Sequence, residues 1–196
     1  KDATTKGPIM PIPNFMFYHD GRHPLIYMYE PPIQKEEYEA GVDELLGTPV
    51  QAINFCLGDG RTVLHDTQVG ELWGHNKGQW PHIIFRRAHQ NAKHLIEQGH
   101  DPLKLICDRA HEKDMLVYPT LLVQQGRGPR EEDVRCSDFR FGNTHLEIGA
   151  HDDVDESFPG YTCLDFMREA VRDERFALIE ETLNKYEVDG FELQMN

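Results

Sequence analysis

The sequence lacks the patterns that mark several common classes of protein. No GxGxxG or GxxxxGK[ST] motif occurs, so the usual phosphate cradle of a nucleotide site is missing. Serine is scarce and no GxSxG occurs, which leaves no visible nucleophile for acyl transfer. The four cysteines form no CxxC pair and the eleven histidines form no HxH or HExxH pair. We therefore expect no cofactor and no bound metal.

Basic residues and long apolar runs are also in short supply. Twenty Lys and Arg stand against 34 Asp and Glu, for a net charge of −14, and the basic residues form no cluster. Because phosphate contacts supply most of the affinity for nucleic acid, we expect no nucleic-acid partner. No apolar run reaches the roughly 20 residues that span a bilayer, so we expect no membrane association. The chain opens at Lys1, and a secreted or periplasmic location would follow if a signal peptide had been removed.

What is present is an alternation of apolar runs and helical patterns. Residues 1–24, with four prolines up to Pro24, predict an irregular lead-in. The predicted strands cover 25–29, 50–55, 115–123 and 188–193, and the predicted helices cover 34–46, 83–98, 102–110 and 173–186. Two long polar segments, 58–81 and 124–164, each follow a strand.

Such alternation predicts an α/β fold with a parallel sheet. We expect a (β/α)8 TIM-type barrel, of which residues 25–196 supply about the first four strands. A complete barrel takes about 250 residues, so the partner we expect is the remaining half of the barrel, on the same or a separate chain. Both long segments would lie at the carboxyl ends of the strands, which is the catalytic face of a barrel and the binding crevice of an open sheet.

Three segments carry a resemblance to a known group. The "VDGFEL" run at 188–193 after a helix ending in "KY", the "GHDPLKLICDRAHEKDMLVYPTLL" unit at 99–122, and "LIYMYEPP" at 25–32 resemble glycoside-hydrolase-like barrels of the family-10-like group. The resemblance covers most of residues 25–196. It implies a carbohydrate-active hydrolase, with an oligo- or polysaccharide as partner.

The resemblance implies that Glu192, at the end of the fourth strand, is the catalytic acid/base. Cleavage of a glycosidic bond uses one carboxylic acid and a second carboxylate. The alternative for Glu192 is a buried carboxylate held by a neighbouring Arg or Lys. Gln194 stands where related chains have Asp, so the second carboxylate would come from Glu30, Asp59 or the missing half.

Sugar binding also needs flat apolar surfaces and planar polar groups. The residues that we expect to supply them are Tyr29 and Glu30 after the first strand, Asn54 in the second, Trp73, His75 and Trp80 in the first long segment, Gln124 and Arg127 after the third strand, and Gln194 and Asn196 at the fourth. Arg127 would bind an acidic sugar or pair with the acidic residues 131–133. Either tryptophan would stack on a sugar or anchor its loop.

Two other functions remain open. Gln194, which interrupts the expected acidic pair, favours a catalytically silent carbohydrate-binding barrel. The eleven histidines favour, less strongly, a metal-dependent barrel enzyme.

Overall fold

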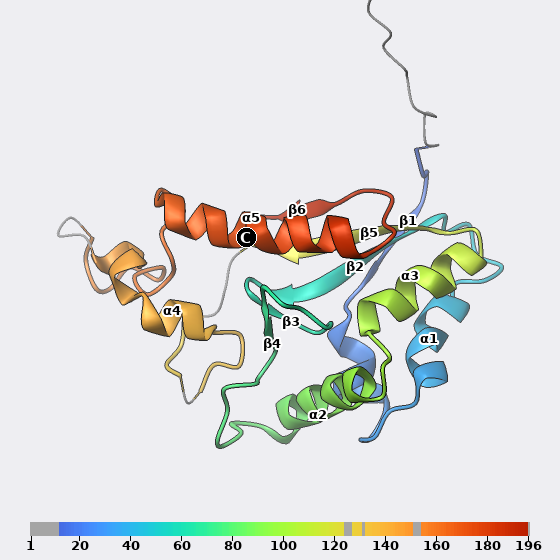
Figure 1. Ribbon diagram of the computed structural model, residues 1–196, viewed down its shortest axis with the longest axis horizontal. Coiled ribbons are helices and arrows are strands. Elements are labelled where there is room, and N and C mark those ends of the chain that lie inside the picture. The colour runs from blue at the N-terminus through green and yellow to red at the C-terminus, as the bar shows by residue number, and fades with distance from the viewer. Residues whose placement is uncertain (1–11, 124–126, 131, 151–153, 196) are drawn as a thin grey trace, which may run out of the picture.

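The computed structural model describes residues 12–123, 127–130, 132–150 and 154–195 (Figure 1). Four strands form the parallel part of its sheet, and their spatial order is their order along the chain: β1 (Met16–His19), β2 (Ala52–Asp59), β5 (Leu116–Leu122) and β6 (Glu192–Gln194). Two short strands extend the sheet, because β3 (Thr62–Val63) pairs antiparallel with the end of β2, and β4 (Glu71–Leu72) pairs parallel with β3. The prediction of a parallel-rich α/β fold is confirmed, and closure into a barrel stays a prediction.

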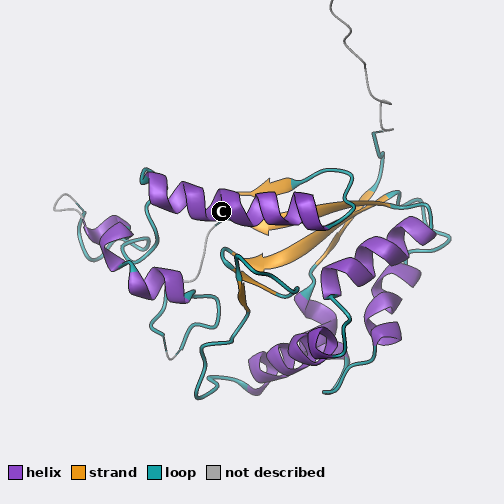
Figure 2. Ribbon diagram, in the orientation of Figure 1, coloured by secondary structure: helices purple, strands orange, loops and turns teal. Residues whose placement is uncertain are grey.

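The helices connect the strands in the expected order (Figure 2). They are η1 (Pro24–Met28), α1 (Lys35–Asp43), α2 (Ile83–Glu97), α3 (Pro102–Glu112), α4 (Asp138–Gly142), η2 (Thr144–Leu146), η3 (Ile148–Ala150) and α5 (Glu169–Lys185). Asp101 begins α3, since its side chain accepts a hydrogen bond from the backbone N–H of Leu103 at 3.1 Å. The predicted helices are confirmed, with ends displaced by a few residues.

One face of the sheet packs against the helices. Its side chains belong to alternate residues of β2 and β5, with Ile53, Phe55, Val117 and Leu121 all at most 1% exposed. The same core contains Val42 of α1, Ala88 of α2, Ile106 of α3 and Leu178 of α5. Because side chains alternate along a strand, the residues between them point to the opposite face.

The predicted first strand is wrong. Residues 25–29 lie in and just after η1, a single wide helical turn with Pro24 in its first turn. Leu25 and Ile26 are buried, and Asn91 of α2 donates hydrogen bonds to the carbonyl oxygens of Leu25 and Tyr29 at 3.0 Å each. The apolar run is therefore a helical turn that buries Leu25 and Ile26 and lies against α2.

The first strand lies instead inside the predicted lead-in. Met16 to His19 pairs in register with Ala52 to Phe55. The prediction of an irregular segment over residues 1–24 fails at this strand, because the prolines at 8, 11 and 13 stop just before it.

Of the described helices, none is long and apolar enough to span a bilayer.

Two buried histidines predict a loss of stability in mild acid. His19 and His65 are 6% and 1% exposed, and burial lowers the pKa of each to about 4, from 6.5. The unfolded chain therefore binds more protons than the folded chain between pH 6.5 and 4, and stability falls as pH falls through this window. We expect the free energy of unfolding, measured with urea, to be several kcal/mol lower at pH 5 than at pH 7, with up to roughly 2 kcal/mol lost per histidine.

A surface variant separates this effect from general acid sensitivity. His145→Ala, at an exposed position, should keep the full pH dependence, whereas His65→Phe should remove about half of the part that the two buried histidines contribute. An unfolding free energy that stays constant from pH 7 to pH 5 would contradict the prediction.

Candidate active site

The face of the sheet opposite the helices carries Glu192. Its carboxylate oxygen Oε2 accepts a hydrogen bond from Thr120 Oγ1 at 2.9 Å and another from Asn54 Nδ2. The three side chains come from β6, β5 and β2. Neither donor is the Arg or Lys that a structural carboxylate was expected to have. Among the described residues, the second oxygen, Oε1, has no hydrogen-bond partner, so it is the atom that a ligand would reach.

The backbone around Glu192 explains one part of the "VDGFEL" run. A Cβ at Gly190 would lie 2.5 Å from the ring of Tyr118, so only glycine lets β6 approach β5 so closely here. Asp189, just before it, accepts hydrogen bonds from the backbone N–H of Val117 at 2.8 Å and from His111 at 2.9 Å. These contacts set the register in which Glu192 faces Thr120.

Two amide oxygens on the same face have no hydrogen-bond partner among the described residues. Gln194 Oε1 and Asn54 Oδ1 are both buried and accept no hydrogen bond among the described residues. Gln194 lies two residues beyond Glu192, so it shares the face of the sheet and is nearer the end of the strand. Buried acceptors are normally paired, so this face favours a ligand or chain that brings hydrogen-bond donors.

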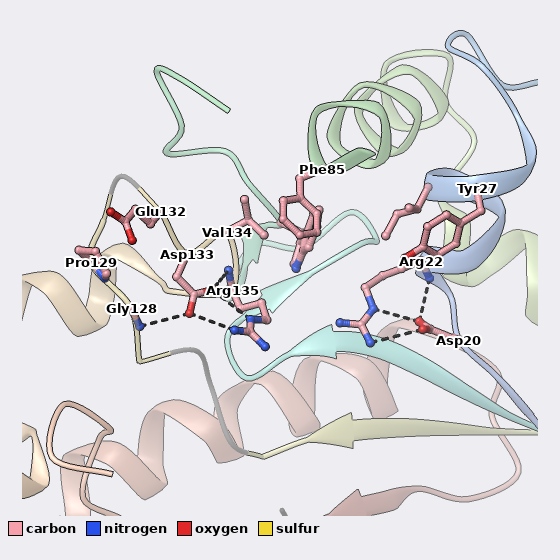
Figure 3. Close-up of a pocket in the computed structure, with 12 residues that line it drawn as sticks. Asp20, Arg22, Tyr27, Phe85, Gly128, Pro129, Glu132, Asp133, Val134 and Arg135 are labelled. Carbon is pink, nitrogen blue, oxygen red and sulfur yellow. Dashed lines mark hydrogen bonds and ion pairs between the residues drawn. The ribbon is translucent and has the colours of Figure 1, made fainter. Parts of the chain in front are cut away.

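A cavity of about 440 Å³ lies at the ends of β1 and β2 (Figure 3). Its lining residues combine charged side chains with aromatic rings: Asp20, Arg22, Tyr27, Trp73, Phe85, Glu132, Asp133 and Arg135 are among them. Figure 3 shows Asp20 with Arg22 on one side of the cavity and Asp133 with Arg135 on the other. We call this cavity the strand-end cleft.

The floor of the strand-end cleft is tied to Asp59, the last residue of β2. Arg22 Nη1 lies 2.7 Å from Asp59 Oδ2, and Arg22 Nε lies 3.0 Å from Asp20 Oδ1. Trp73 Nε1 donates to Asp59 Oδ2 at 3.2 Å. Burial raises the pKa of Asp59, and Arg22 and Trp73 act against that rise. Asp59 thus lies at a strand end as expected, and its place after the apolar run 50–57 was the available sequence signal.

The other wall of the cleft holds its own ion pair. Asp133 Oδ1 accepts from Arg135 Nε at 3.0 Å, and its Oδ2 accepts from the backbone N–H of Gly128 at 3.2 Å. Burial acts to raise the pKa of Asp133, but the bonds from Arg135 and Gly128 lower it by more, so the pKa lies below its usual value. Sequence reasoning missed this pair, which lies within one loop, and it missed Arg22, whose partner Asp59 is 37 residues away in the chain.

The two tryptophans differ in what they can contact. Trp73 is 1% exposed and packs in the core, so it anchors its loop and offers no stacking surface. Trp80 is half-buried and lines a second cavity of about 520 Å³ together with Arg130 and Glu132. Glu132 lines both cavities, which makes them neighbours.

The remaining predicted site residues are dispersed. Tyr29 and Glu30 follow η1 rather than a strand, and Glu30 pairs with Arg87 of α2, so their placement at a strand end is wrong. Arg127 donates to the carbonyl oxygen of Pro159 at 2.6 Å. His75 contacts Glu71 and Asp138. Gln124 and Asn196 lie outside the described residues.

The comparisons with known proteins support the fold. No protein-family model matches the chain, and no curated protein matches it either. It is similar to the crystal structure of a noncanonic maltogenic alpha-amylase, AmyB from Thermotoga neapolitana, with 13% sequence identity and a TM-score of 0.54. The match covers 91% of this chain and 38% of the amylase chain. The chain thus shares its mixed α/β architecture with part of a TIM-barrel glycoside hydrolase.

Proposed function

We propose that this chain is the N-terminal part of a carbohydrate-active hydrolase, in which Glu192 supplies a catalytic carboxyl group. The observation that carries the proposal is the position of Glu192, which Asn54 and Thr120 orient on the face of the sheet that the helices leave uncovered. An oriented carboxyl with one unpaired oxygen suits proton transfer to or from a glycosidic oxygen. The similarity to an alpha-amylase agrees with this chemistry.

Glycosidic cleavage needs a second carboxyl group, and Asp59 is the best candidate among those expected. It ends β2 beside the strand-end cleft, whereas Glu30 has a side chain that is 76% exposed and is held by Arg87. Burial raises the pKa of Asp59, while Arg22 and Trp73 oppose that rise. The rest of the barrel would supply the group if Asp59 does not.

The strand-end cleft and the Trp80 cavity would bind the sugar. Hydroxyl groups of a sugar pair with carboxylates and guanidinium groups, which the cleft offers on both walls. A half-buried indole offers a flat apolar surface against which a pyranose ring can stack. An oligosaccharide longer than one ring would extend from the cleft past Glu132 to Trp80.

We expect Trp80→Ala to weaken oligosaccharide binding by about tenfold, because stacking on an indole contributes on the order of 1 kcal/mol beyond simple burial. Calorimetric titration of a panel that includes malto-, cello- and xylo-oligosaccharides would measure the loss. Phe176→Ala is the matched control, since it removes an exposed aromatic side chain of α5 that lines neither cavity, and it should leave the affinity unchanged. Equal affinities for Trp80→Ala and the wild type would remove Trp80 from the site.

A silent carbohydrate-binding barrel is the second candidate, and Gln194 favours it. Its side chain cannot lose a proton, yet it lies on the face of Glu192, and its buried oxygen accepts no hydrogen bond from the residues that the structure describes. In a silent barrel, bound glycan would remain intact however long it is incubated. Release of reducing ends from any glycan in the panel would decide for the hydrolase.

The remaining half of the barrel is the protein partner that we propose. Both outer edges of the parallel sheet carry exposed apolar side chains, with Phe15 and Phe17 at the β1 edge and Leu193 and Met195 at the β6 edge. Further strands pairing with both edges would bury these side chains and the free backbone groups together. Limited proteolysis of a longer product that contains this sequence should then leave residues beyond 196 attached to it.

A further inference from the structure

Three metal-ligating side chains from two segments converge beside the Trp80 cavity, because Asn76 and Arg130, which line that cavity, donate to Asp138. Glu71 lies in β4, His75 follows it by four residues, and Asp138 begins α4. His75 Nε2 lies 3.0 Å from Asp138 Oδ2 and 3.4 Å from Glu71 Oε2, and one ligand atom from each residue lies within 4.8 Å of the other two. The geometry points to a binding site for a divalent transition-metal ion such as Zn²⁺, held by these three side chains.

The orientation of His75 is the first argument for a cation here. His75 Nδ1 lies 3.0 Å from the carbonyl oxygen of Leu72, and a carbonyl accepts only from an N–H. Because Nδ1 is engaged by that carbonyl, Nε2 is the ring nitrogen left to face the two carboxylate oxygens, and a cation placed between them would contact all three groups. A histidine whose other nitrogen donates to a carbonyl is also the usual form of a metal-bound histidine.

The two carboxylates are held by their far oxygens. Arg61 Nε donates to Glu71 Oε1 at 3.1 Å, and Arg130 and Asn76 donate to Asp138 Oδ1. The near oxygens, Glu71 Oε2 and Asp138 Oδ2, are thereby turned toward His75. The backbone N–H of Asp138 also donates to Glu71 Oε2 at 2.7 Å, which fixes the distance between the two segments.

The separations fit the size of a zinc site. Nitrogen and oxygen ligands lie about 2.0–2.1 Å from Zn²⁺, so tetrahedral ligands are separated by about 3.3–3.4 Å. The observed 3.0 and 3.4 Å need only small adjustments. Three protein ligands leave a fourth position for water. The sequence did not reveal this site, because His75 and Asp138 are 63 residues apart.

The bound ion would join the long segment 58–81 to the long segment 124–164. Its binding would not depend on the proposed cleavage of a sugar. We would strip the full chain of metal and titrate it with Zn²⁺ by calorimetry, and with Co²⁺ while recording its visible absorption. The expected result is one equivalent of bound Zn²⁺, a rise in Tm on binding, and Co²⁺ bands typical of four-coordinate nitrogen and oxygen ligation. His75→Ala should weaken Zn²⁺ binding at least tenfold.

Asp138→Asn guards against a variant that simply fails to fold, since the amide oxygen can still accept the bonds from Asn76 and Arg130. It should also lose at least tenfold in affinity. His94→Ala, on α2, should bind Zn²⁺ as the wild type does. Wild-type protein that binds no Zn²⁺ would overturn the proposal. Equal binding by His75→Ala and the wild type would overturn it as well.

Discussion

Glu192→Gln is expected to lower the turnover of a cleaved glycan by about 10²–10⁴-fold, the usual contribution of a positioned acid or base. Glutamine has the shape of glutamate, and its amide oxygen can still accept the bonds from Asn54 and Thr120. The fold and the affinity for oligosaccharide should therefore change little. Reducing-end release measured over time, beside calorimetric binding of the same oligosaccharide, separates chemistry from recognition.

Two further variants locate the effect. Glu187→Gln changes the charge in the same way at an exposed position and should turn over like the wild type. Thr120→Val keeps the carboxyl group but removes one of its two donors, so it should lower kcat by a smaller factor, on the order of tenfold. Thr120 acts as a positioning residue, and its loss should also shift the pH profile of kcat. Unchanged turnover in Glu192→Gln would end the assignment of Glu192.

Arg22→Ala is expected to lower the free energy of unfolding by about 3–5 kcal/mol, as the removal of one partner of a buried ion pair does. The side chains of Arg22 and Asp59 are 20% and 11% exposed, so the carboxylate of Asp59 would remain largely buried without its cation. Its remaining side-chain partner is Trp73. Urea unfolding at pH 7 measures the loss.

The double variant Arg22→Ala, Asp59→Asn shows whether the cost comes from the unpaired charge. Neutralising Asp59 should recover more than half of the lost stability, since an amide is far less costly to bury than a carboxylate. Arg86→Ala, at an exposed position, should change stability by less than about 0.5 kcal/mol. If Arg22→Ala were as mild as Arg86→Ala, the ion pair would not stabilise the floor of the cleft.

The sequence correctly predicted those elements whose apolar pattern fits only one kind of secondary structure. The buried runs of β2 and β5 and the amphipathic α2 and α3 were recognised because the sheet buries one face of each. The first strand was misplaced because a run such as 25–29 suits a buried strand and a buried turn equally, and Pro24 did not decide between them. Met16 to His19 is short and follows several prolines, so its pairing with β2 was not visible locally.

The site was less predictable than the fold, for a physical reason. Glu192 and Asn54 were identified because they lie on predicted strands, but their contact with each other depends on the curvature of the sheet across β5. Trp73 shows the opposite error. Its aromatic ring suggested a sugar platform, and only the partner of its indole N–H, Asp59, reveals that the ring is inside. Contacts between residues far apart in the chain leave no signal in a single sequence.

The lengths of the four parallel strands have a consequence for how the chain behaves at high concentration. The inner strands β2 and β5 have eight and seven residues, while the outer strands β1 and β6 have four and three. A long outer strand would template pairing with other molecules and seed amyloid-like aggregates, whereas the four residues of β1 give few backbone hydrogen bonds to an intruder. The short β1 edge therefore discourages runaway association, although a partner that also covers its exposed apolar side chains can still pair there.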